Sequence, residues 1–509
     1  MLVSSLSYGL SGIAGLPVQV EVNLSFGIPA FDVVGLPDLA VKESRERVRA
    51  ALKNCGFPFP DERITVNLAP ADMKKEGPAF DLPIALGILA CKGLIPPAGL
   101  SDAAFFGELS LNGDVRSVRG ALALTISARE DGVQTLYLPA ANLPEVRSIG
   151  GIRLIPLENL RQAVLHLTGE APIPPAETVG YQALLSERSL QADFAYVKGQ
   201  RSAKRALEIA AAGGHNVLMV GPPGSGKTLM ARCIPSILPD MTFEEALETT
   251  RIHSVSGSLP ESGLLTERPF RSPHHTASQI SLMGGGPHAR PGEVSRAHNG
   301  VLFLDELPEY RRDVLEALRQ PMEDGFITIT RVGAQSTYPC NFMLVCSMNP
   351  CPCGNYGSRT QPCRCSQSEI RRYLNRVSGP LLDRVDMHVE VETIDADRIA
   401  DLADEEPSAS IRARVEQARD VQRSRYAREP FTCNARLNAR TLNQYCAMEP
   451  DARQVLKLAS DQMGLSNRAY SRILKVARTI ADLAGSETIG AAHVAEAIRY
   501  RSMDRKYWN

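Results

Sequence analysis

Gly221-Pro-Pro-Gly-Ser-Gly-Lys-Thr228 is the stretch of sequence that decides the fold. It fits the pattern G-x-x-x-x-G-K-[ST], in which glycines let backbone N–H groups close around a phosphate, the lysine reaches the terminal phosphates and the threonine can hold Mg²⁺. An apolar run at 216–220 predicts a buried strand before it, and a helix is expected from 229, so a phosphate would lie at a helix N-terminus. A glycine-rich turn without a ligand is the alternative, and both flanks disfavour it. The predicted nucleotide-binding residues are Gly221, Pro222, Pro223, Gly224, Ser225, Gly226, Lys227 and Thr228.

Asp305 and Glu306 follow a second apolar run, Val-Leu-Phe-Leu at 301–304. This is the Walker B pattern, in which the aspartate holds Mg²⁺ through water and the glutamate polarises the water that attacks the γ-phosphate of ATP. A surface acidic pair at the end of a strand is the alternative. Together with the loop upstream, the pair predicts an ATP-hydrolysing α/β domain in which Asp305 and Thr228 bind Mg²⁺ and Lys227 and Glu306 act in catalysis.

Asn349 follows a third strand-like run at 342–347 and falls where AAA+ ATPases carry the polar residue called sensor 1. Further along, Leu-Leu-Asp-Arg-Val-Asp at 381–386 resembles the arginine-finger segment of that superfamily, which makes Arg384 the finger candidate. A structural salt bridge is the alternative role for Arg384. The resemblance implies that both residues assist catalysis.

Ser-Asn-Arg-Ala at 466–469 resembles the sensor 2 element of the same superfamily, with Arg468 in the active role and Arg472, one helical turn further on, as its rival. All of these pieces stand in AAA+ order along the chain. An arginine finger completes the ATP site of a neighbouring subunit and supplies positive charge to the transition state. The resemblance therefore implies a homohexameric ring with ATP at the subunit interfaces.

Four cysteines stand directly after Asn349-Pro350 in the spacing C-x-C, nine residues, C-x-C: Cys351, Cys353, Cys363 and Cys365. Four thiolates in a short, polar, glycine-containing loop suit tetrahedral Zn²⁺, with an iron–sulfur cluster as the alternative. A disulfide pair does not fit a reducing compartment. Because cysteine fills every coordination position, we expect a structural zinc site and not a catalytic one.

The composition predicts a soluble globular protein of about three domains, with 509 residues of which 44% are hydrophobic. A formal net charge of −1 provides no global basic field for nucleic acid, although a ring can place a few cations in its pore. No apolar run approaches the roughly 18 residues of a membrane span, and residues 1–17 lack the basic start of a signal peptide. Together with eleven cysteines in no secreted-type framework, this predicts a cytoplasmic protein that does not engage a membrane.

Four segments are expected along the chain. Residues 1–167 predict an α/β domain, in which alternating apolar residues at 18–24 form a half-buried strand. Residues 168–192 contain three prolines and predict a linker. Residues 193–395 would form the AAA+ P-loop core, with the zinc loop at 351–365. Residues 396–509 predict an all-α lid, with an apolar helical stripe formed by Ile473, Val476, Ile480 and Leu483.

Part of the first domain resembles the peptidase domain of Lon, over residues 106–118 and 132–139. Ala79 stands where Lon carries its nucleophilic serine, and no lysine occurs at 122–124, where the Lon lysine is expected. Lys74 and Lys75 are close in sequence, but no serine stands at the expected position to pair with them. Because a Ser–Lys dyad needs both groups, the resemblance implies a Lon-protease-like α/β fold without peptidase activity.

Long insertions separate the nucleotide motifs, since Lys227 and Asp305 lie 78 positions apart. Residues 324–336 alternate and then turn, which predicts a β-hairpin. Hairpins at this place in related ATPases project into the ring channel, so Arg331 is a candidate phosphate contact, and a plain structural hairpin is the alternative. The insertions also carry histidines without tight i, i+4 pairing, which we expect to be hydrogen-bonded or solvated and not metal ligands: His274, His275, His288 and His298.

The last residues, 499–508, are basic and aromatic. They predict a solvated terminus, with nucleic-acid binding as the alternative.

Nearly the full length resembles the YifB/ComM family of magnesium-chelatase-like bacterial ATPases, most specifically at 298–306 and 466–482. The resemblance implies an ATP-driven hexameric DNA motor, a helicase or branch-migration translocase in homologous recombination and natural transformation. Its partners would be branched or single-stranded DNA in the ring pore and recombination proteins. A chelatase-type remodeller of a protein partner is the alternative, disfavoured because a chelatase motor subunit is expected to lack the first domain. An ATP-dependent protease is disfavoured by Ala79.

Overall fold

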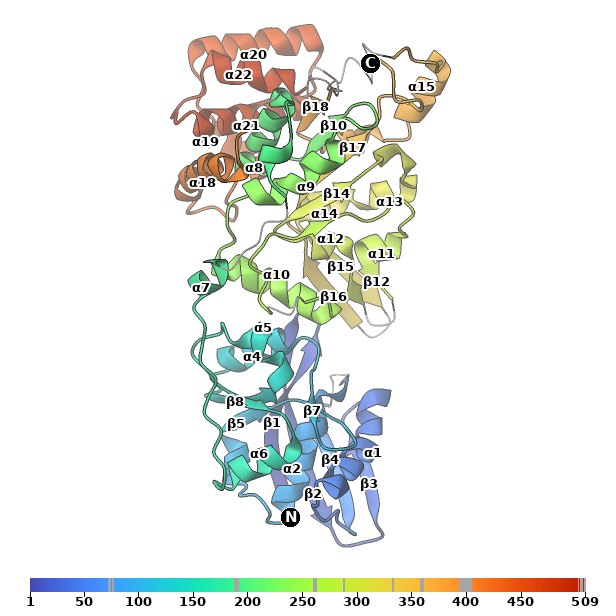
Figure 1. Cartoon of the computed structure of the whole chain (residues 1–509), viewed down its shortest axis with the longest axis vertical. Coiled ribbons are helices and arrows are strands. Elements are labelled where there is room, and N and C mark those ends of the chain that lie inside the picture. The colour runs from blue at the N-terminus through green and yellow to red at the C-terminus, as the bar shows by residue number, and fades with distance from the viewer. Residues whose placement is uncertain are drawn as a thin grey trace. The chain divides into compact units, whose positions relative to one another are not determined.

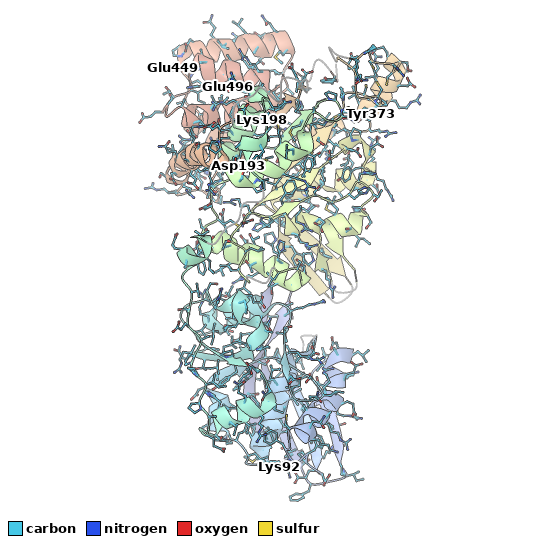
Figure 2. All side chains as sticks on the ribbon, in the orientation of Figure 1. Lys92, Asp193, Lys198, Tyr373, Glu449 and Glu496 are labelled. Carbon is cyan, nitrogen blue, oxygen red and sulfur yellow. The ribbon has the colours of Figure 1, made fainter. Side chains whose placement is uncertain are left out.

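The chain divides into two compact units in the computed structural model (Figure 1), which describes residues 1–71, 75, 77–186, 192–259, 263–286, 289–331, 334–357, 361–392, 405–501, 503 and 507. The first unit consists of Met1–Arg188, Thr242–Thr266 and Thr330–Tyr338. The second consists of Ser189–Met241, Glu267–Ile329 and Pro339–Asn509. Figure 2 shows the described side chains on the same ribbon. No helix within the described ranges is both long and apolar enough to cross a membrane.

A seven-stranded mixed sheet forms the centre of the first unit, in the order β3-β4-β2-β1-β5-β8-β9. β2 pairs antiparallel with β1 and β4, while the remaining pairs are parallel. Val18, Val20 and Val22 of β2 are fully buried and alternate with more exposed residues, which confirms the predicted strand. The strands are β1 (Leu2–Ser11), β2 (Ala14–Ser25), β3 (Ala30–Val34), β4 (Arg63–Ala69), β5 (Ala103–Phe105), β8 (Thr135–Pro139) and β9 (Arg153–Leu157), and β6 (Glu108–Leu109) pairs with β7 (Val115–Arg116) beside them.

The helices of the first unit bury apolar residues against this sheet. In α1 (Leu39–Asn54) the Asp38 carboxylate caps the first turn by accepting from the Val41 N–H, and Val48 and Leu52 lie inward one turn apart. Every residue of α2 (Asp81–Cys91) is buried. The remaining helices that precede the second unit in sequence are α3 (Ala98–Ser101), α4 (Ala121–Glu130), α5 (Leu143–Val146), α6 (Leu160–Leu167) and α7 (Tyr181–Ser186), with single 3₁₀ turns at Pro78–Phe80 and Ala140–Asn142.

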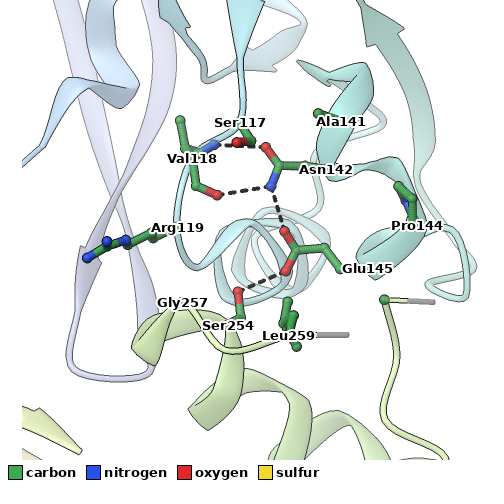
Figure 3. Close-up of a pocket in the computed structure, with 11 residues that line it drawn as sticks. Ser117, Val118, Arg119, Ala141, Asn142, Pro144, Glu145, Ser254, Gly257 and Leu259 are labelled. Atoms are coloured by element: carbon green, nitrogen blue, oxygen red, sulfur yellow. Dashed lines mark hydrogen bonds between the residues drawn. The ribbon is translucent and has the colours of Figure 1, made fainter. Parts of the chain in front are cut away.

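Helix α10 (Phe243–Ser256) belongs to the first unit although its sequence lies between the two nucleotide motifs. It packs on α4, and a buried carboxylate fastens it: Glu145 accepts from the Ser254 hydroxyl at 2.8 Å and from the Asn142 amide at 2.6 Å. Asn142 in turn bonds both backbone polar groups of Val118 at 2.9 Å (Figure 3). Burial raises the pKa of Glu145, and the two donors oppose that rise only in part.

A five-stranded parallel sheet forms the centre of the second unit, in the order β11-β14-β17-β10-β18. Its three middle strands are buried along their whole length, as expected for parallel strands covered on both faces. The strands are β10 (Val217–Val220), β11 (Phe270–Arg271), β14 (Val301–Leu304), β17 (Met343–Met348) and β18 (Met387–Glu390). The helices of this part of the unit are α8 (Arg201–Gly213), α9 (Lys227–Ile237), α11 (Gln279–Met283), α12 (Glu293–Arg296), α13 (Arg312–Ala317), α14 (Arg319–Asp324), α15 (Gln367–Leu374) and α16 (Gly379–Leu382), with 3₁₀ turns at Phe194–Tyr196 and Leu307–Glu309.

The C-terminal part of the second unit is helical, as predicted. The apolar stripe is confirmed, because Ile473, Val476 and Ile480 of α21 are buried in the same core cluster as α8. The described residues of the tail are not solvated as predicted, because Tyr507 is 7% exposed and packs with Met503 in the core cluster around β17. The helices are α18 (Ser408–Arg425), α19 (Ala439–Tyr445), α20 (Pro450–Met463), α21 (Asn467–Leu483) and α22 (Ala491–Arg499), with a 3₁₀ turn at Asn434–Arg436.

The predicted hairpin is present as β15 (Phe326–Arg331) and β16 (Ala334–Pro339), which form a two-stranded sheet. Its turn and the Arg331 side chain lie outside the described residues. A second small pair joins β12 (Gly284–Gly285) to β13 (Arg290–Pro291), and His288, in the turn between them, also lies outside the described residues.

Candidate nucleotide site

The loop at 221–226 joins the end of β10 to the start of α9, as the sequence predicts. Gly224 and Gly226 adopt φ values of +73° and +87°, in the left-handed region that only glycine enters without strain. The Gly221 N–H donates to the Met348 carbonyl at 3.1 Å, which ties the loop to the neighbouring strand β17. The sheet therefore fixes the base of the loop, and the loop leads directly into the N-terminus of α9, where a phosphate would be favoured.

Lys227 lies folded back onto the loop that precedes it. Its amine donates to the carbonyls of Gly221 and Pro222 at 2.7 and 2.8 Å, and lies 3.3 Å from the Asn349 side-chain oxygen. The residue is 8% exposed. Burial lowers the pKa of Lys227 to about 8, although the nearby charges of Asp305 and Glu306 act in the opposite direction.

Asp305 meets two hydroxyl groups at the end of β14. Its Oδ2 accepts from Thr228 Oγ1 at 2.8 Å, and its Oδ1 accepts from the Ser347 hydroxyl. A carboxylate and a threonine hydroxyl are oxygen ligands of the kind that Mg²⁺ takes in phosphate-binding sites, so this pair fits the metal. Sequence reasoning missed Ser347, whose only signal is a lone hydroxyl inside the apolar run of β17.

Glu306 turns away from the strand in a strained conformation, with φ +52° in the left-handed region. Its carboxylate is 57% exposed and lies 3.5 Å from His275 Nδ1. Glu306 also lines a cavity of about 470 Å³, together with Asn349, Pro352, Arg372 and Arg376. An exposed carboxylate beside such a cavity is accessible to water.

Among the described residues, no histidine of the insertion belongs to a group of side chains that could hold a metal ion. His274 Nδ1 lies 2.8 Å from the Thr276 hydroxyl, and His298 accepts from the Asn341 N–H at 3.0 Å. These two confirm the prediction of hydrogen-bonded histidines. His275 is 31% exposed, and its Nδ1 lies 3.5 Å from the Glu306 carboxylate.

The Arg384 side chain is already bound to other groups of the same chain. Its Nη1 donates to the Pro380 carbonyl at 2.7 Å, its Nη2 pairs with Glu323, and the side chain is 11% exposed. This is the geometry of the structural salt bridge that the sequence left as the alternative. To reach the nucleotide of a neighbouring subunit, the guanidinium would have to leave both partners.

The two sensor 2 candidates differ sharply in exposure. Arg468 is 70% exposed and has a loose contact of 3.6 Å to Asp383. Arg472 is 15% exposed, donates to the Val385 carbonyl at 2.8 Å and lies 3.8 Å from Asp386. Arg472 is therefore held by the core, whereas Arg468 is available to a ligand.

The four cysteines after Asn349 converge. Their sulfurs all lie within 4.8 Å of one another, and Cys351, Cys353 and Cys363 are 3.4–3.7 Å apart pairwise. Tetrahedral Zn²⁺ with Zn–S bonds of about 2.3 Å requires sulfurs about 3.8 Å apart, so the residues fit the ion. Backbone N–H groups of Arg364 and Asn355 lower the pKa of Cys353 to about 6, which favours the thiolate that binds metal.

In the first unit, Ala79 packs against an apolar cluster that contains Leu122 and Leu124. The positions that the Lon resemblance assigns to a serine and a lysine thus share one apolar environment. Lys75 is buried and donates to the Pro70 carbonyl, while Lys74 lies outside the described residues.

Comparison with known proteins gives similarity over almost the whole chain. Residues 193–399 match the family model described as magnesium chelatase, subunit ChlI, residues 20–142 match subunit ChlI of Mg-chelatase, and residues 405–501 match its C-terminal model. Competence protein ComM of Haemophilus influenzae is 43% identical over 97% of this chain and 96% of its own length. The protein YifB of Escherichia coli is 42% identical over the same shares.

The chain belongs to the YifB/ComM family of magnesium-chelatase-like AAA+ proteins. Membership implies ATPase activity, with ATP and Mg²⁺ as ligands. The magnesium-chelatase 67 kDa subunit of Chlorobaculum parvum is 28% identical over only 31% of this chain. We expected a chelatase motor subunit to lack the first domain. However, residues 20–142 match a model named for a chelatase subunit, so the presence of this domain does not argue against a chelatase-type activity.

Proposed function

We propose that this member of the YifB/ComM family is an ATPase whose hydrolytic site is formed by Lys227, Thr228, Asp305, Glu306 and Asn349. The observation that carries the proposal is the convergence of three strand ends. The amine of Lys227 lies 3.3 Å from Asn349, and Thr228 lies 2.8 Å from Asp305. These groups come from the C-terminal ends of β10, β14 and β17, which are neighbours in one parallel sheet.

The proposed role of each side chain in ATP hydrolysis depends on whether that side chain is buried or exposed. Lys227 would exchange its two carbonyl partners for phosphate oxygens, and the N–H groups of the loop would hold the remaining oxygens. Thr228 and Asp305 would hold Mg²⁺, which supplies the positive charge that offsets the phosphate oxygens. Glu306, exposed at the cavity, would orient the attacking water and accept its proton. Asn349 would sense the terminal phosphate through its contact with the lysine.

We extend this proposal to the assembly of the protein and to the other segments of the chain. Arg384 would serve as the arginine finger of a homohexamer after leaving Glu323, and Arg468 is the better sensor 2 candidate because it is exposed. The segment 396–509 would act as the lid, and 193–395 as the AAA+ core. Residues 1–167 would keep a Lon-protease-like fold that lost its dyad at Ala79, joined to the core by the linker 168–192. Free thiols at all eleven cysteines suit the cytoplasm.

We further propose that ATP hydrolysis drives a DNA motor, a helicase or branch-migration translocase, on branched or single-stranded DNA in the ring pore. Support comes from the name of the relative, a competence protein that is 43% identical over nearly the full length. A remodeller of a protein partner is the second candidate. It is favoured by the chelatase models that match all three segments of the chain.

One experiment separates the two candidates. ATP turnover would be measured with and without a synthetic four-way or three-stranded DNA junction, following strand displacement in the same reaction. DNA-stimulated turnover with junction movement is expected, and Lys227→Ala should remove both. Turnover that ignores DNA would reject the motor. ATP-independent displacement by Lys227→Ala would reject the coupling of hydrolysis to strand movement.

Cys351, Cys353, Cys363 and Cys365 would bind one Zn²⁺ per chain. The ion would be structural, because four thiolates complete its coordination. Metal analysis of the purified protein tests this: about one zinc per chain is expected, and Cys353→Ser should remove most of it.

A further inference from the structure

The segment that leaves β17 touches the phosphate-binding loop at three successive points. The Met348 carbonyl accepts from the Gly221 N–H at 3.1 Å. One residue later, the Asn349 side chain lies 3.3 Å from the Lys227 amine. The third contact is made by the cysteine loop, where the backbone of Gly354 lies against the ring of Pro223. The chain thus runs along the phosphate-binding loop before it returns to α15.

The contact between Gly354 and Pro223 leaves no room for a side chain. A Cβ on Gly354 would lie 2.4 Å from Cδ and 2.9 Å from Cγ of Pro223, well inside van der Waals contact. Gly354 also has φ +83°. Because the proline ring is rigid and is part of the phosphate-binding loop, a displacement of Gly354 displaces the loop.

The described part of the cysteine loop has no regular secondary structure to hold Gly354 in place. Between Met348 and Gln367, the described residues form neither helix nor strand. Local support includes a hydrogen bond from the Gly354 N–H to the Cys351 carbonyl at 3.0 Å and one from the Tyr356 N–H to the Cys351 sulfur at 3.3 Å. Cys351 and Tyr356 also pack in the core cluster around β17. Two of the four convergent cysteines, Cys351 and Cys353, stand within three residues of Gly354. A metal on the four sulfurs would cross-link this segment to Cys363 and Cys365 at the far end of the loop.

We infer that the four-cysteine loop is a metal-held clamp on the ATP site, in which Gly354 is a positioning residue for the phosphate-binding loop through Pro223. This rests on the nucleotide and zinc sites proposed above. The loop borders the hydrolytic side as well, because Pro352, between the first two cysteines, lines the cavity that contains Glu306 and Asn349. Zinc and ATP are therefore coupled ligands: each raises the affinity of the chain for the other by the same factor.

The test measures ATP binding by a fluorescent ATP analogue and zinc content on the full-length protein. Gly354→Ala should keep its zinc and raise the Kd for the analogue about tenfold, because overpacking must push the phosphate-binding loop aside. Gly485→Ala is the matched control, since Gly485 has φ +68° but nothing within 4 Å of its would-be Cβ. In a Pro223→Ala background the colliding ring atoms are gone, so adding Gly354→Ala should change the Kd much less.

Zinc removal gives an independent arm. Protein stripped with a thiol reagent and a chelator should bind the analogue at least tenfold more weakly, and added Zn²⁺ should restore the affinity. Reciprocally, saturating ATP should slow zinc release to a chromogenic chelator in the wild type but not in Lys227→Ala.

Three results would overturn the clamp: an unchanged Kd in Gly354→Ala, an equal loss in Gly485→Ala, or ATP binding that is indifferent to zinc. A wild-type protein that binds no ATP would instead reject the proposed nucleotide site. A wild-type protein that takes up no zinc would reject the proposed metal.

Discussion

The buried amine of Lys227 predicts that ATP binding weakens in mildly alkaline solution. The pKa of Lys227 is lowered from its ordinary value to about 8, with burial as the main cause. A phosphate ligand needs the charged amine, so only the protonated fraction of the free protein is competent to bind. That fraction falls from about nine-tenths at pH 7 to about one-tenth at pH 9 for a pKa of about 8.

The apparent Kd scales inversely with the competent fraction. We therefore expect the Kd for ATP to rise about tenfold between pH 7 and pH 9. A lysine with an unshifted pKa would remain charged throughout this range and would give a flat profile. The sign follows from the charge: ATP favours the protonated amine, so binding takes up a proton above pH 8 and is opposed by rising pH.

The assay is a titration with a fluorescent ATP analogue and Mg²⁺ at pH 7, 8 and 9. Lys227→Arg is the matched control, because a guanidinium stays charged across this range. Its Kd, whatever its absolute value, should not follow the same profile. A wild-type Kd that stays constant from pH 7 to pH 9, or an identical rise in Lys227→Arg, would refute the argument from burial.

Three other predictions concern separate parts of the molecule. Glu306→Gln should bind ATP with nearly unchanged Kd and hydrolyse it about 10²-fold more slowly or worse in single turnover, and rapid hydrolysis would remove Glu306 as the group that activates water. Arg384→Ala should lower turnover about 10³-fold at saturating ATP if the finger role is right, whereas a loss of stability alone would assign Arg384 to its pair with Glu323. Burial raises the pKa of Glu145, so its charge destabilises the first unit as pH rises above the ordinary pKa of a glutamate. Glu145→Gln keeps the shape, an oxygen that accepts from the Asn142 amide, and an NH2 that can donate to the Ser254 hydroxyl, so it should raise the melting temperature at pH 8 more than at pH 5, and a lower melting temperature at both would contradict this.

Much of the second unit could be predicted because short motifs stand at the ends of apolar runs. In a parallel sheet those ends lie on one edge, so the motifs at 221–228 and 305–306 and Asn349 had to come together. The cysteines converge for a similar reason, since a short loop holds two C-x-C pairs close. In both cases the positions of the residues along the chain are enough to predict that their side chains lie close together.

The features that could not be predicted depend on partners far apart in sequence. Arg384 pairs with Glu323, 61 positions away, and nothing in the arginine-finger segment indicates that carboxylate. Tyr507 is buried by residues around β17, so a tail of basic and aromatic residues was predicted wrongly as solvated. The buried side of helix α10 is largely polar, with Thr249, Thr250 and Ser254 among its residues, so its sequence does not indicate that it packs on α4 of the first unit.

The segments of the two units alternate along the chain, and this has a consequence for folding during synthesis. The first unit does not consist of one continuous segment: after Arg188 it still lacks α10 and the segment ending at Tyr338, about 150 residues further along. At about 5–20 residues per second, a ribosome needs roughly 10–30 s to supply them. Helix α10 ends at Ser256, so α4 waits without the helix that covers it for roughly the first half of that interval. A nascent chain held before α10 emerges should recruit chaperones, and ribosome-bound chains of increasing length should lose that interaction once Ser256 has left the exit tunnel.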